Sequence, residues 1–494
     1  MMSPKSVVSR LKGDLIAIYK QAVESVRPES LIRNAIYLRE ESLLIRDPID
    51  ADPSKETEVD IQNAKLHVIG GGKSVLGMAS ELGHLVSRAK LTEKFSHGVL
   101  SIPRGLESVA SSEESKRGLA SIGVECHFGS VNNLPDDDSV RATSRILENI
   151  SEACRSDQDG NFESIFIVLL SGGGSACLTS PRFLTLSEKL DIIGRLVQRG
   201  AGIKDLNAVR MHFSNVKGGR LSRHILRNNP KARIISLILS DVVGDPIEYI
   251  ASGPTFVPPN GTSGTSVEQR MRQVLSRYNI DCDISPHLLE TCDKSECPEP
   301  KLVDNERLVM NRIIGNNTVA LNHAETHAKS LGYEVIRFDK QLEGSNEQVL
   351  DWMEARKRTA KSGKSLVLAG GETTVKKLPG ESWGVGGRLQ ELCLDYMIGK
   401  LTKAEERRPD GLDMLLAGST DGQDGPTDVA ACMASLADHK LSAASSSFTL
   451  HDCLEAKRSH NSYKFWSTRR ADWLIKSGLS GTNVMDIYLL ATIT

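Results

Sequence analysis

Five short apolar segments in this chain each run directly into a turn built from glycine, hydroxyl and carboxylate residues. The apolar segments cover residues 66–69, 167–170, 237–239, 366–369 and 415–417. Continuous apolar runs of this length, separated by helical patterns, are typical of parallel strands whose two faces are covered by helices. The turns that follow are Gly70-Gly71-Gly72-Lys73-Ser74, Ser171-Gly172-Gly173-Gly174-Ser175, Ser240-Asp241-Val242-Val243-Gly244-Asp245, Gly370-Gly371-Glu372-Thr373-Thr374 and Gly418-Ser419-Thr420-Asp421-Gly422-Gln423-Asp424-Gly425. The sequence therefore predicts an α/β fold with mostly parallel, helix-covered sheets.

The chain has 494 residues, which is too long for one ordinary hydrophobic core. Residues 256–305 are rich in proline, glycine and polar residues, as expected of a linker or insertion. We predict an N-terminal α/β domain at 1–257, a linker or insertion at 258–305, and a C-terminal α/β domain at 306–494. Apolar residues at helical spacing predict helix over residues 14–45, whereas the aspartate-rich residues 130–160 are expected to form polar loops or solvated helix ends.

Composition excludes two classes of protein. The 61 basic and 63 acidic residues give a formal net charge of -2, whereas domains held to nucleic acid by bulk charge are strongly basic. Apolar runs such as residues 165–170 fall far short of the roughly 20 residues that span a bilayer. Nine scattered cysteines are typical of reduced cytosolic thiols. We expect a cytoplasmic protein without nucleic-acid or membrane partners, and the basic N-terminal residues leave a short mitochondrial presequence open.

The positions of the glycine-rich turns indicate the type of ligand. Ligands of open α/β sheets bind outside the carboxyl ends of the strands, and glycine lets backbone N–H groups approach an anion closely. Five such turns therefore indicate a polyanion site, with nucleotide phosphates as the best candidate. Two common phosphate motifs are absent: His67 stands where a P-loop needs glycine, and no strand is followed by G-x-G-x-x-G.

Basic and acidic residues near these turns suit phosphoryl transfer. Lys73 adjoins three glycines, and Arg210, Lys217 and Arg388 lie in or beside turns. Such cations would neutralise a transferring phosphoryl group. Lys217 is open to a second interpretation, as part of a solvated helix end. The aspartate pairs Asp241/Asp245 and Asp421/Asp424 would hold Mg²⁺ or accept a proton from the acceptor hydroxyl.

At these residues the chain resembles the class II glycerate kinases, a family with an N-terminal glycerate-kinase domain and a C-terminal MOFRL domain. The resemblance covers residues 15–487. It implies two α/β domains with the active site in the cleft between them. It also implies phosphorylation of D-glycerate by ATP and Mg²⁺, at the 2-hydroxyl. The motifs that carry it are Gly70-Gly71-Gly72-Lys73 with residues 77–79, then residues 170–176, 207–210, 216–221, 240–246, 251–255, 315–317, 370–375, 386–388 with 390–392, 420–428, and 481–484 with Asp486.

The resemblance and the residue chemistry together give a candidate site. Lys73 and Arg388 match the basic catalytic residues of the family, and Asp421 joins them as a catalytic candidate. We assign substrate binding to Asn207, Arg210 and Lys217, and metal binding to Asp241 and Asp245. The nucleotide and phosphate ligands are Gly71, Gly72, Ser171, Gly172, Gly173, Gly174, Ser175, Asn316, Gly371, Glu372 and Thr373. ATP and Mg²⁺ are the expected cofactors, D-glycerate the expected small-molecule substrate, and a homodimer is left open.

One departure from the family pattern keeps alternatives open. Leu389 stands in the run Gly-Gly-Arg-Leu-Gln-Glu where the family has an asparagine. A missing phosphate contact there would favour a weakly active nucleotide-binding regulator. A hydroxypyruvate reductase is the other alternative, although the missing dinucleotide motif counts against it.

Overall fold

The computed structural model describes residues 3–49, 56–258, 267–280, 308–361, 363–375, 383–406, 412–441 and 447–493. These residues form two compact units. The N-terminal unit comprises residues 31–314, and the C-terminal unit comprises residues 1–30 together with 315–494. No helix in the described ranges is both long and apolar enough to cross a membrane.

The N-terminal unit is built on a six-stranded sheet with the strand order β6-β5-β4-β7-β8-β9. Neighbouring strands from β6 to β8 pair in parallel. The strands of this sheet are β4 (Ala64–Gly71), β5 (Gly98–Ile102), β6 (Val124–Phe128), β7 (Glu163–Leu170), β8 (Arg233–Leu239) and β9 (Val309–Gly315). This sheet confirms the predicted parallel α/β architecture.

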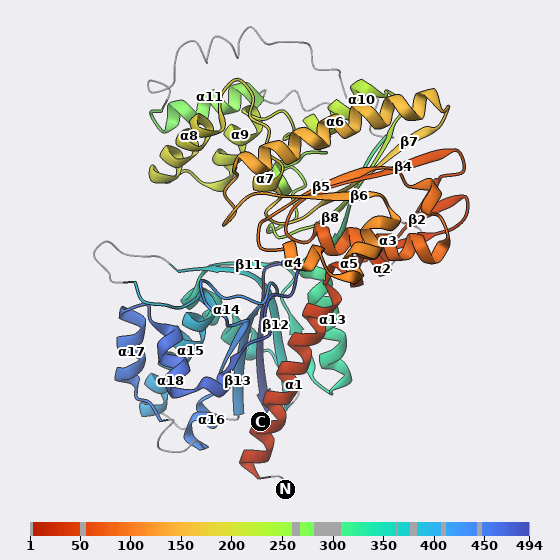
Figure 1. The fold of residues 1–494 in the computed structure, drawn as a ribbon. Coiled ribbons are helices and arrows are strands. Elements are labelled where there is room, and N and C mark those ends of the chain that lie inside the picture. Colours follow the sequence, from red (N-terminus) through yellow and green to blue (C-terminus); the bar gives the residue numbers. More distant parts are fainter. Residues whose placement is uncertain are drawn as a thin grey trace. The chain divides into compact units, whose positions relative to one another are not determined.

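Helices cover both faces of this sheet (Figure 1). On one face, α6 and α10 pack over a core that contains Ile146, Ile150, Phe166 and Ile225. On the other, α3 contacts β4, β5 and β7, and α5 packs against α3. The helices of the unit are α2 (Pro28–Ala35), α3 (Val75–Ala89), α4 (Glu107–Ala110), α5 (Glu113–Ser121), α6 (Asp137–Asp159), α7 (Gly174–Cys177), α8 (Leu186–Gln198), α9 (Ile203–His212), α10 (Arg220–Asn228) and α11 (Val267–Arg277).

The C-terminal unit holds a mixed seven-stranded sheet. The order is β10-β12-β16-β13-β14-β15, and β11 pairs with β12. The last strand, β16, lies between β12 and β13 and is antiparallel to both, so β12 and β13 run in the same direction. The strands are β10 (Glu334–Arg337), β11 (Leu342–Ser345), β12 (Lys364–Thr374), β13 (Leu412–Ser419), β14 (Ala431–Ala434), β15 (Leu474–Ile475) and β16 (Asp486–Ile493).

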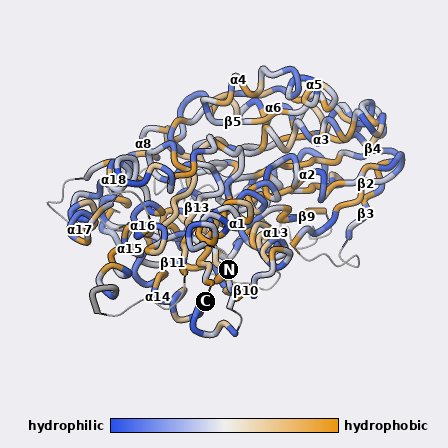
Figure 2. Tube along the Cα trace, turned by 90° about the horizontal axis from the view of Figure 1, so that it is seen from below, coloured by the Kyte–Doolittle hydropathy of each residue, from blue (hydrophilic) through white to orange (hydrophobic). Residues whose placement is uncertain are grey.

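Helices again form two layers on this second sheet (Figure 1). The helices α1 and α13 cover one face, and α14 and α15 cover the other. Figure 2 shows both hydrophobic and hydrophilic positions along α1, whose buried residues include Leu11, Leu15 and Ile18. The helices of this unit are α1 (Pro4–Ser25), α13 (Asn317–Ser330), α14 (Asn346–Lys357), α15 (Arg388–Glu406), α16 (Leu436–Leu441), α17 (Leu450–Arg458) and α18 (Ser462–Arg469).

The compact units differ from the predicted domain boundaries in three places. The N-terminal helix α1 packs against α13 of the C-terminal unit, and the Tyr19 hydroxyl donates to the Ser419 carbonyl at 2.6 Å. The strand β9 completes the N-terminal sheet although it follows the predicted linker. Within that linker, α11 packs on α9, while residues 259–266 and 281–307 lie outside the described residues.

One segment was wrongly predicted, and a second was predicted only in part. Residues 36–45 form strands β1 (Ile36–Leu38) and β2 (Ser42–Ile45) instead of continuing a helix, and these join β3 (Thr57–Asp60) in a small antiparallel sheet. Residues 137–159 form the long helix α6, so of the two predicted alternatives, loops or solvated helix ends, only the second applies, to the aspartates at its start. The Asp136 side chain caps this helix, and acidic residues in a first helical turn are stabilised by the helix dipole. Its acidic start therefore marks a helix N-terminus.

Candidate active site

Three predicted turns meet at one edge of the N-terminal sheet. The parallel register pairs Gly71 with Leu170, and Leu170 with Ile238, so β4, β7 and β8 end side by side. The residues that follow these ends contain Lys73, the glycines after Ser171, and Asp241. The sequence prediction that these turns lie together is confirmed for this unit.

The glycine-rich turn after β7 separates a lysine from a carboxylate. A Cβ atom added at Gly172 would lie 2.3 Å from the Asp241 Oδ2 atom, and one at Gly173 would lie 3.1 Å from the Lys73 Cγ atom. The Lys73 backbone N–H donates to the Gly172 carbonyl at 2.9 Å, which holds the two turns together. Lys73 is exposed. Thus a cation and an acid flank a turn whose glycines contribute no side chains of their own.

A chain of polar side chains begins at the end of this turn. The Ser175 and Ser252 hydroxyls are 3.0 Å apart, and the Ser252 hydroxyl donates to the Asn207 Oδ1 atom at 3.3 Å. The Arg210 guanidinium donates to the same oxygen at 3.4 Å. The structure therefore places two of the three predicted substrate ligands, Asn207 and Arg210, near the end of the glycine-rich turn that follows β7.

Lys217, the third predicted substrate ligand, is buried. Its ammonium group donates to the carbonyls of Ser175 at 2.7 Å and Leu178 at 2.6 Å, and the residue is 1% exposed. Burial lowers the pKa of Lys217 well below its ordinary value, and the nearby charges of Lys189 and Arg210 add to the effect. The alternative interpretation of Lys217 as part of a solvated helix end is therefore wrong.

In the C-terminal unit, three strands align a second set of predicted residues. The register pairs Gly371 of β12 and Ser419 of β13 with Asp486 of β16. Gly371, Glu372 and Thr373 were expected in a turn but belong to β12. The strand continues through them because β11 pairs with this part of β12 in parallel.

Arg388 opens α15 and is held by two acids. Its Nε and Nη2 atoms lie 2.6 Å and 2.9 Å from the two carboxylate oxygens of Asp486, which has no exposed surface. Its Nη1 atom lies 2.6 Å from a carboxylate oxygen of Glu372. Burial acts to lower the pKa of Arg388, but the bonds to Asp486 raise it overall, so the guanidinium stays charged.

Asp486 was not assigned a role by the sequence analysis. Burial raises the pKa of Asp486 to about 7, and the ion pair with Arg388 opposes that rise. The Tyr488 hydroxyl donates to the Asp486 Oδ2 atom at 3.2 Å. Asp486 belongs to the motif of residues 481–484 and 486 that carries the family resemblance, and it directly precedes an apolar strand. Neither signal specifies a role.

The remaining candidates of this unit occupy turns and helix starts. The Asp421 Oδ1 atom accepts hydrogen bonds from the Ser419 hydroxyl at 2.7 Å and from the Gln423 backbone N–H at 2.9 Å. The buried Asp424 carboxylate accepts the backbone N–H groups of Leu389 and Gln390 and thereby caps α15. Asn316 caps α13 through its side-chain oxygen.

The described part of the chain contains no group of three or more His, Cys, Asp or Glu side chains placed to hold a metal ion. This finding does not conflict with a magnesium site, because Mg²⁺ at kinase sites is held by one or two carboxylates together with substrate phosphates and water. Asp241 and Asp245 both follow β8 and supply the oxygen donors that Mg²⁺ prefers.

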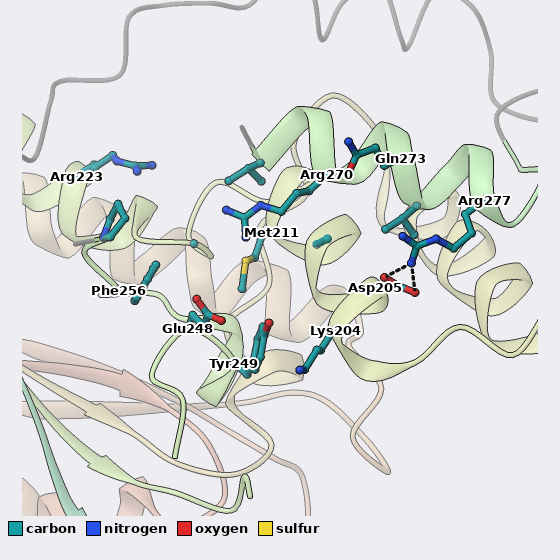
Figure 3. A pocket seen from close by; sticks show the side chains of 15 residues that line it. Lys204, Asp205, Met211, Arg223, Glu248, Tyr249, Phe256, Arg270, Gln273 and Arg277 are labelled. Carbon is teal, nitrogen blue, oxygen red and sulfur yellow. Dashed lines mark hydrogen bonds and ion pairs between the residues drawn. The ribbon is translucent and has the colours of Figure 1, made fainter. Parts of the chain in front are cut away.

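A separate cavity of about 300 Å³ lies between α9, α11 and the segment 248–258 (Figure 3). An ion pair between Arg277 and Asp205 lies at its rim. None of the sequence-predicted site residues is among its described lining. The cavity is therefore distinct from the glycine-turn site.

Family models match most of the chain. The domain of unknown function DUF4147 matches residues 14–293, and the MOFRL family matches residues 365–486. The chain is 31% identical to glycerate kinase of Mus musculus, covering 96% of this chain and 91% of the relative. The chain belongs to the glycerate kinase family. A D-glycerate 2-kinase of Thermotoga maritima is 29% identical, covering 72% of this chain and 77% of the relative.

The fold agrees with this family. A solved glycerate kinase structure from Thermotoga maritima superposes with a TM-score of 0.75 at 24% identity, covering 98% of this chain and all of that chain. The structure explains why Leu389 can replace the asparagine of the glycerate kinase family. The Leu389 side chain has no exposed surface, and its backbone N–H donates to Asp424. The Leu389 side chain therefore packs α15 against the core of the C-terminal unit.

Proposed function

We propose that the protein transfers the γ-phosphoryl group of ATP to the 2-hydroxyl of D-glycerate, forming 2-phosphoglycerate and ADP. The observation that carries this proposal is the glycine-rich turn after β7, flanked by Lys73 and Asp241. Such an arrangement leaves backbone N–H groups accessible to phosphate oxygens, with a cation and a metal-binding acid on either side. Family membership supports the same reaction.

The proposed roles divide between the two units. In the N-terminal unit, Gly71, Gly72 and residues 171–175 bind phosphates, Lys73 neutralises charge on the transferring group, and Asn207 and Arg210 bind D-glycerate. Lys217 supports the same site by holding the carbonyls of Ser175 and Leu178. In the C-terminal unit, Arg388 and Asp421 act in catalysis and Asn316, Gly371, Glu372 and Thr373 bind the nucleotide. The cleft between the two units stays a prediction.

Asp241 and Asp245 would hold Mg²⁺. When bound, the ion would neutralise phosphate charge in this site. The Asp241 carboxylate already lies against Gly172 of the phosphate turn, which suits a shared ion. A role of Asp421 as proton acceptor suits a carboxylate fixed by the Ser419 hydroxyl.

Two alternatives are disfavoured. A hydroxypyruvate reductase would need a dinucleotide-binding turn, and the turns after β4 and β7 lack G-x-G-x-x-G. A weakly active nucleotide-binding regulator was motivated by Leu389, whose buried position makes it a packing residue.

The test is ³¹P NMR of the purified protein with Mg-ATP and D-glycerate. We expect ADP and 2-phosphoglycerate to appear together. The appearance of 3-phosphoglycerate would contradict the proposed position of transfer, and intact ATP would contradict the kinase itself. We also propose that the protein is cytosolic, which fluorescence microscopy of the tagged chain tests. We propose that it is a homodimer, which light scattering of the pure protein tests.

A further inference from the structure

Three basic side chains lie close together, one from α8, one from α9 and one from the segment before α10, and no acid among the described residues forms an ion pair with them. Lys189 of α8 is 5% exposed, and its ammonium nitrogen is buried with no hydrogen-bond partner among the described residues. Arg210 of α9 is partly exposed, and Lys217 is fully buried against two carbonyls. Within the described ranges, no carboxylate lies within ion-pair distance of any of the three.

The three charges act on one another. Burial lowers the pKa of Lys189 to about 8, and the charge of Arg210 contributes to that decrease. Burial likewise lowers the pKa of Lys217, with Lys189 and Arg210 adding to it. Buried charges in folded proteins are normally paired, because an isolated charge in a low-dielectric interior is costly. Among the residues that the structure describes, the cluster therefore has no negative charge that would balance it.

The cluster adjoins neutral groups that suit a hydroxylated ligand. Arg210 shares the Asn207 oxygen with the Ser252 hydroxyl, and Ser252 lies 3.0 Å from the Ser175 hydroxyl. Ser175 lies in α7, directly after the glycine-rich turn that follows β7. If the anionic end of a small ligand binds Arg210, the Asn207 amide and the Ser252 and Ser175 hydroxyls of the protein lie between that end and the glycine-rich turn.

We propose that Lys189, together with Arg210 and Lys217, forms an anion-binding site that the carboxylate of D-glycerate completes. The partly exposed Arg210 contacts the carboxylate, and Lys189 is a positioning residue that acts from behind it through its charge. This inference rests on the proposed function, since it names where that reaction's substrate is recognised.

A phosphate group of the nucleotide is the other anion that such a cluster could attract. The carboxylate is favoured because the glycine turn and Lys73 already provide for phosphates, whereas the hydroxyl and amide groups beside Arg210 match the hydroxyls of glycerate. The experiment separates the two sources by measuring both ligands.

The test is isothermal titration calorimetry of the full-length protein and its Lys189→Met variant with D-glycerate and, separately, with MgADP. Losing a charge-assisted contribution should weaken D-glycerate binding about tenfold or more, and MgADP binding should stay unchanged. The melting temperature should hold or rise, because the variant no longer buries an unbalanced ammonium group. Lys204→Met is the matched control, since Lys204 is an exposed lysine on α9.

Several outcomes would overturn the inference. Unchanged D-glycerate affinity with a lower melting temperature would make Lys189 a purely structural residue, and weakened MgADP binding alone would assign the cluster to the nucleotide. No D-glycerate binding by the wild-type protein would also overturn it. Lys189→Gln serves as a second variant, and Lys189→Arg should restore part of the affinity. A wild-type protein that binds D-glycerate without phosphorylating it would contradict the proposed function alone.

Discussion

Arg388 and Asp486 form a two-point ion pair in which a partly exposed guanidinium neutralises a carboxylate that has no exposed surface. The pair fixes Arg388 at the start of α15, with its third nitrogen on the partly exposed Glu372. Arg388 cannot turn away from Asp486 without leaving that carboxylate buried and unbalanced. In the proposed catalytic role of Arg388, its Nη1 atom would therefore leave Glu372 and bind a substrate phosphate, while Nε and Nη2 stay on Asp486.

Arg388→Ala should lower both stability and activity. Leaving Asp486 unpaired should reduce the free energy of unfolding by about 3 kcal/mol, and losing the cation should reduce kcat/KM by about 10²–10³. Urea unfolding and steady-state kinetics measure the two effects. The double variant Arg388→Ala/Asp486→Asn should regain most of the stability but none of the activity. Recovery of activity in the double variant would reduce Arg388 to a structural partner of Asp486.

Gly172→Ala should displace the carboxylate of Asp241, the proposed metal ligand. The added methyl group would lie 2.3 Å from the Asp241 Oδ2 atom, so the carboxylate must move. We expect kcat to fall about tenfold or more, since misplaced groups at a reacting site are costly. The Mg²⁺ concentration for half-maximal activity should rise as well.

Gly194→Ala is the matched control for this prediction. Gly194 lies within α8 and has no atom within 4 Å of its added Cβ position. Replacing a helical glycine by alanine should raise the free energy of unfolding by about 0.5–1 kcal/mol, with kinetics unchanged. Equal kinetics in the two variants would contradict the placement of Asp241 at the phosphate turn.

The ends of the strands could be predicted from the sequence, because each end is marked by an apolar run followed directly by a glycine-rich turn. Each apolar strand and its glycine turn are contiguous, so the edge that carries Lys73 and Asp241 followed from general rules for parallel sheets. The pairing of β16 with β12 and β13 could not be predicted in this way. Asp486 meets Gly371 and Ser419 only through strand pairing between distant segments.

Helix α6 and Lys189 show a second limit of sequence analysis. The aspartates at the start of α6 have the composition of a solvated loop, although Asp136 caps the helix. The segment is a helix because Ile146 and Ile150 are buried on it, and their burial could not be read from the aspartates. Lys189 has the pattern of an ordinary helical lysine. Its burial depends on how α8 packs, which residue spacing alone does not specify.

Lys73→Ala should leave the fold intact and lower kcat. The Lys73 side chain is exposed beside Gly173, so its removal creates no buried cavity. Loss of charge stabilisation at a transferring phosphoryl group should reduce kcat by about 10²–10³. The control is Lys116→Ala, because Lys116 is an exposed lysine of α5 in the same unit. Turnover equal to that of the control would remove Lys73 from the mechanism.

The buried Lys189 should make stability depend on pH in the alkaline range. Burial lowers the pKa of Lys189 from 10.5 to about 8, with Arg210 contributing, and Lys217 also faces the group. Between these two pH values the unfolded chain keeps the proton while the folded chain has lost it. The contribution of Lys189 to stability must therefore rise with pH across this window, whereas the full cost of its buried charge is present below pH 8.

Urea unfolding of the wild-type protein and Lys189→Met at several pH values between 7 and 10.5 checks this prediction. The variant should be more stable at pH 7, and its advantage should shrink by roughly 3 kcal/mol as the pH rises, the value that follows from a pKa shift of this size. Saturating D-glycerate should narrow the difference at pH 7, because the carboxylate would balance the charged wild-type cluster. A pH-independent difference between the two proteins would show that Lys189 does not titrate in this range and that its ammonium group is balanced within the fold.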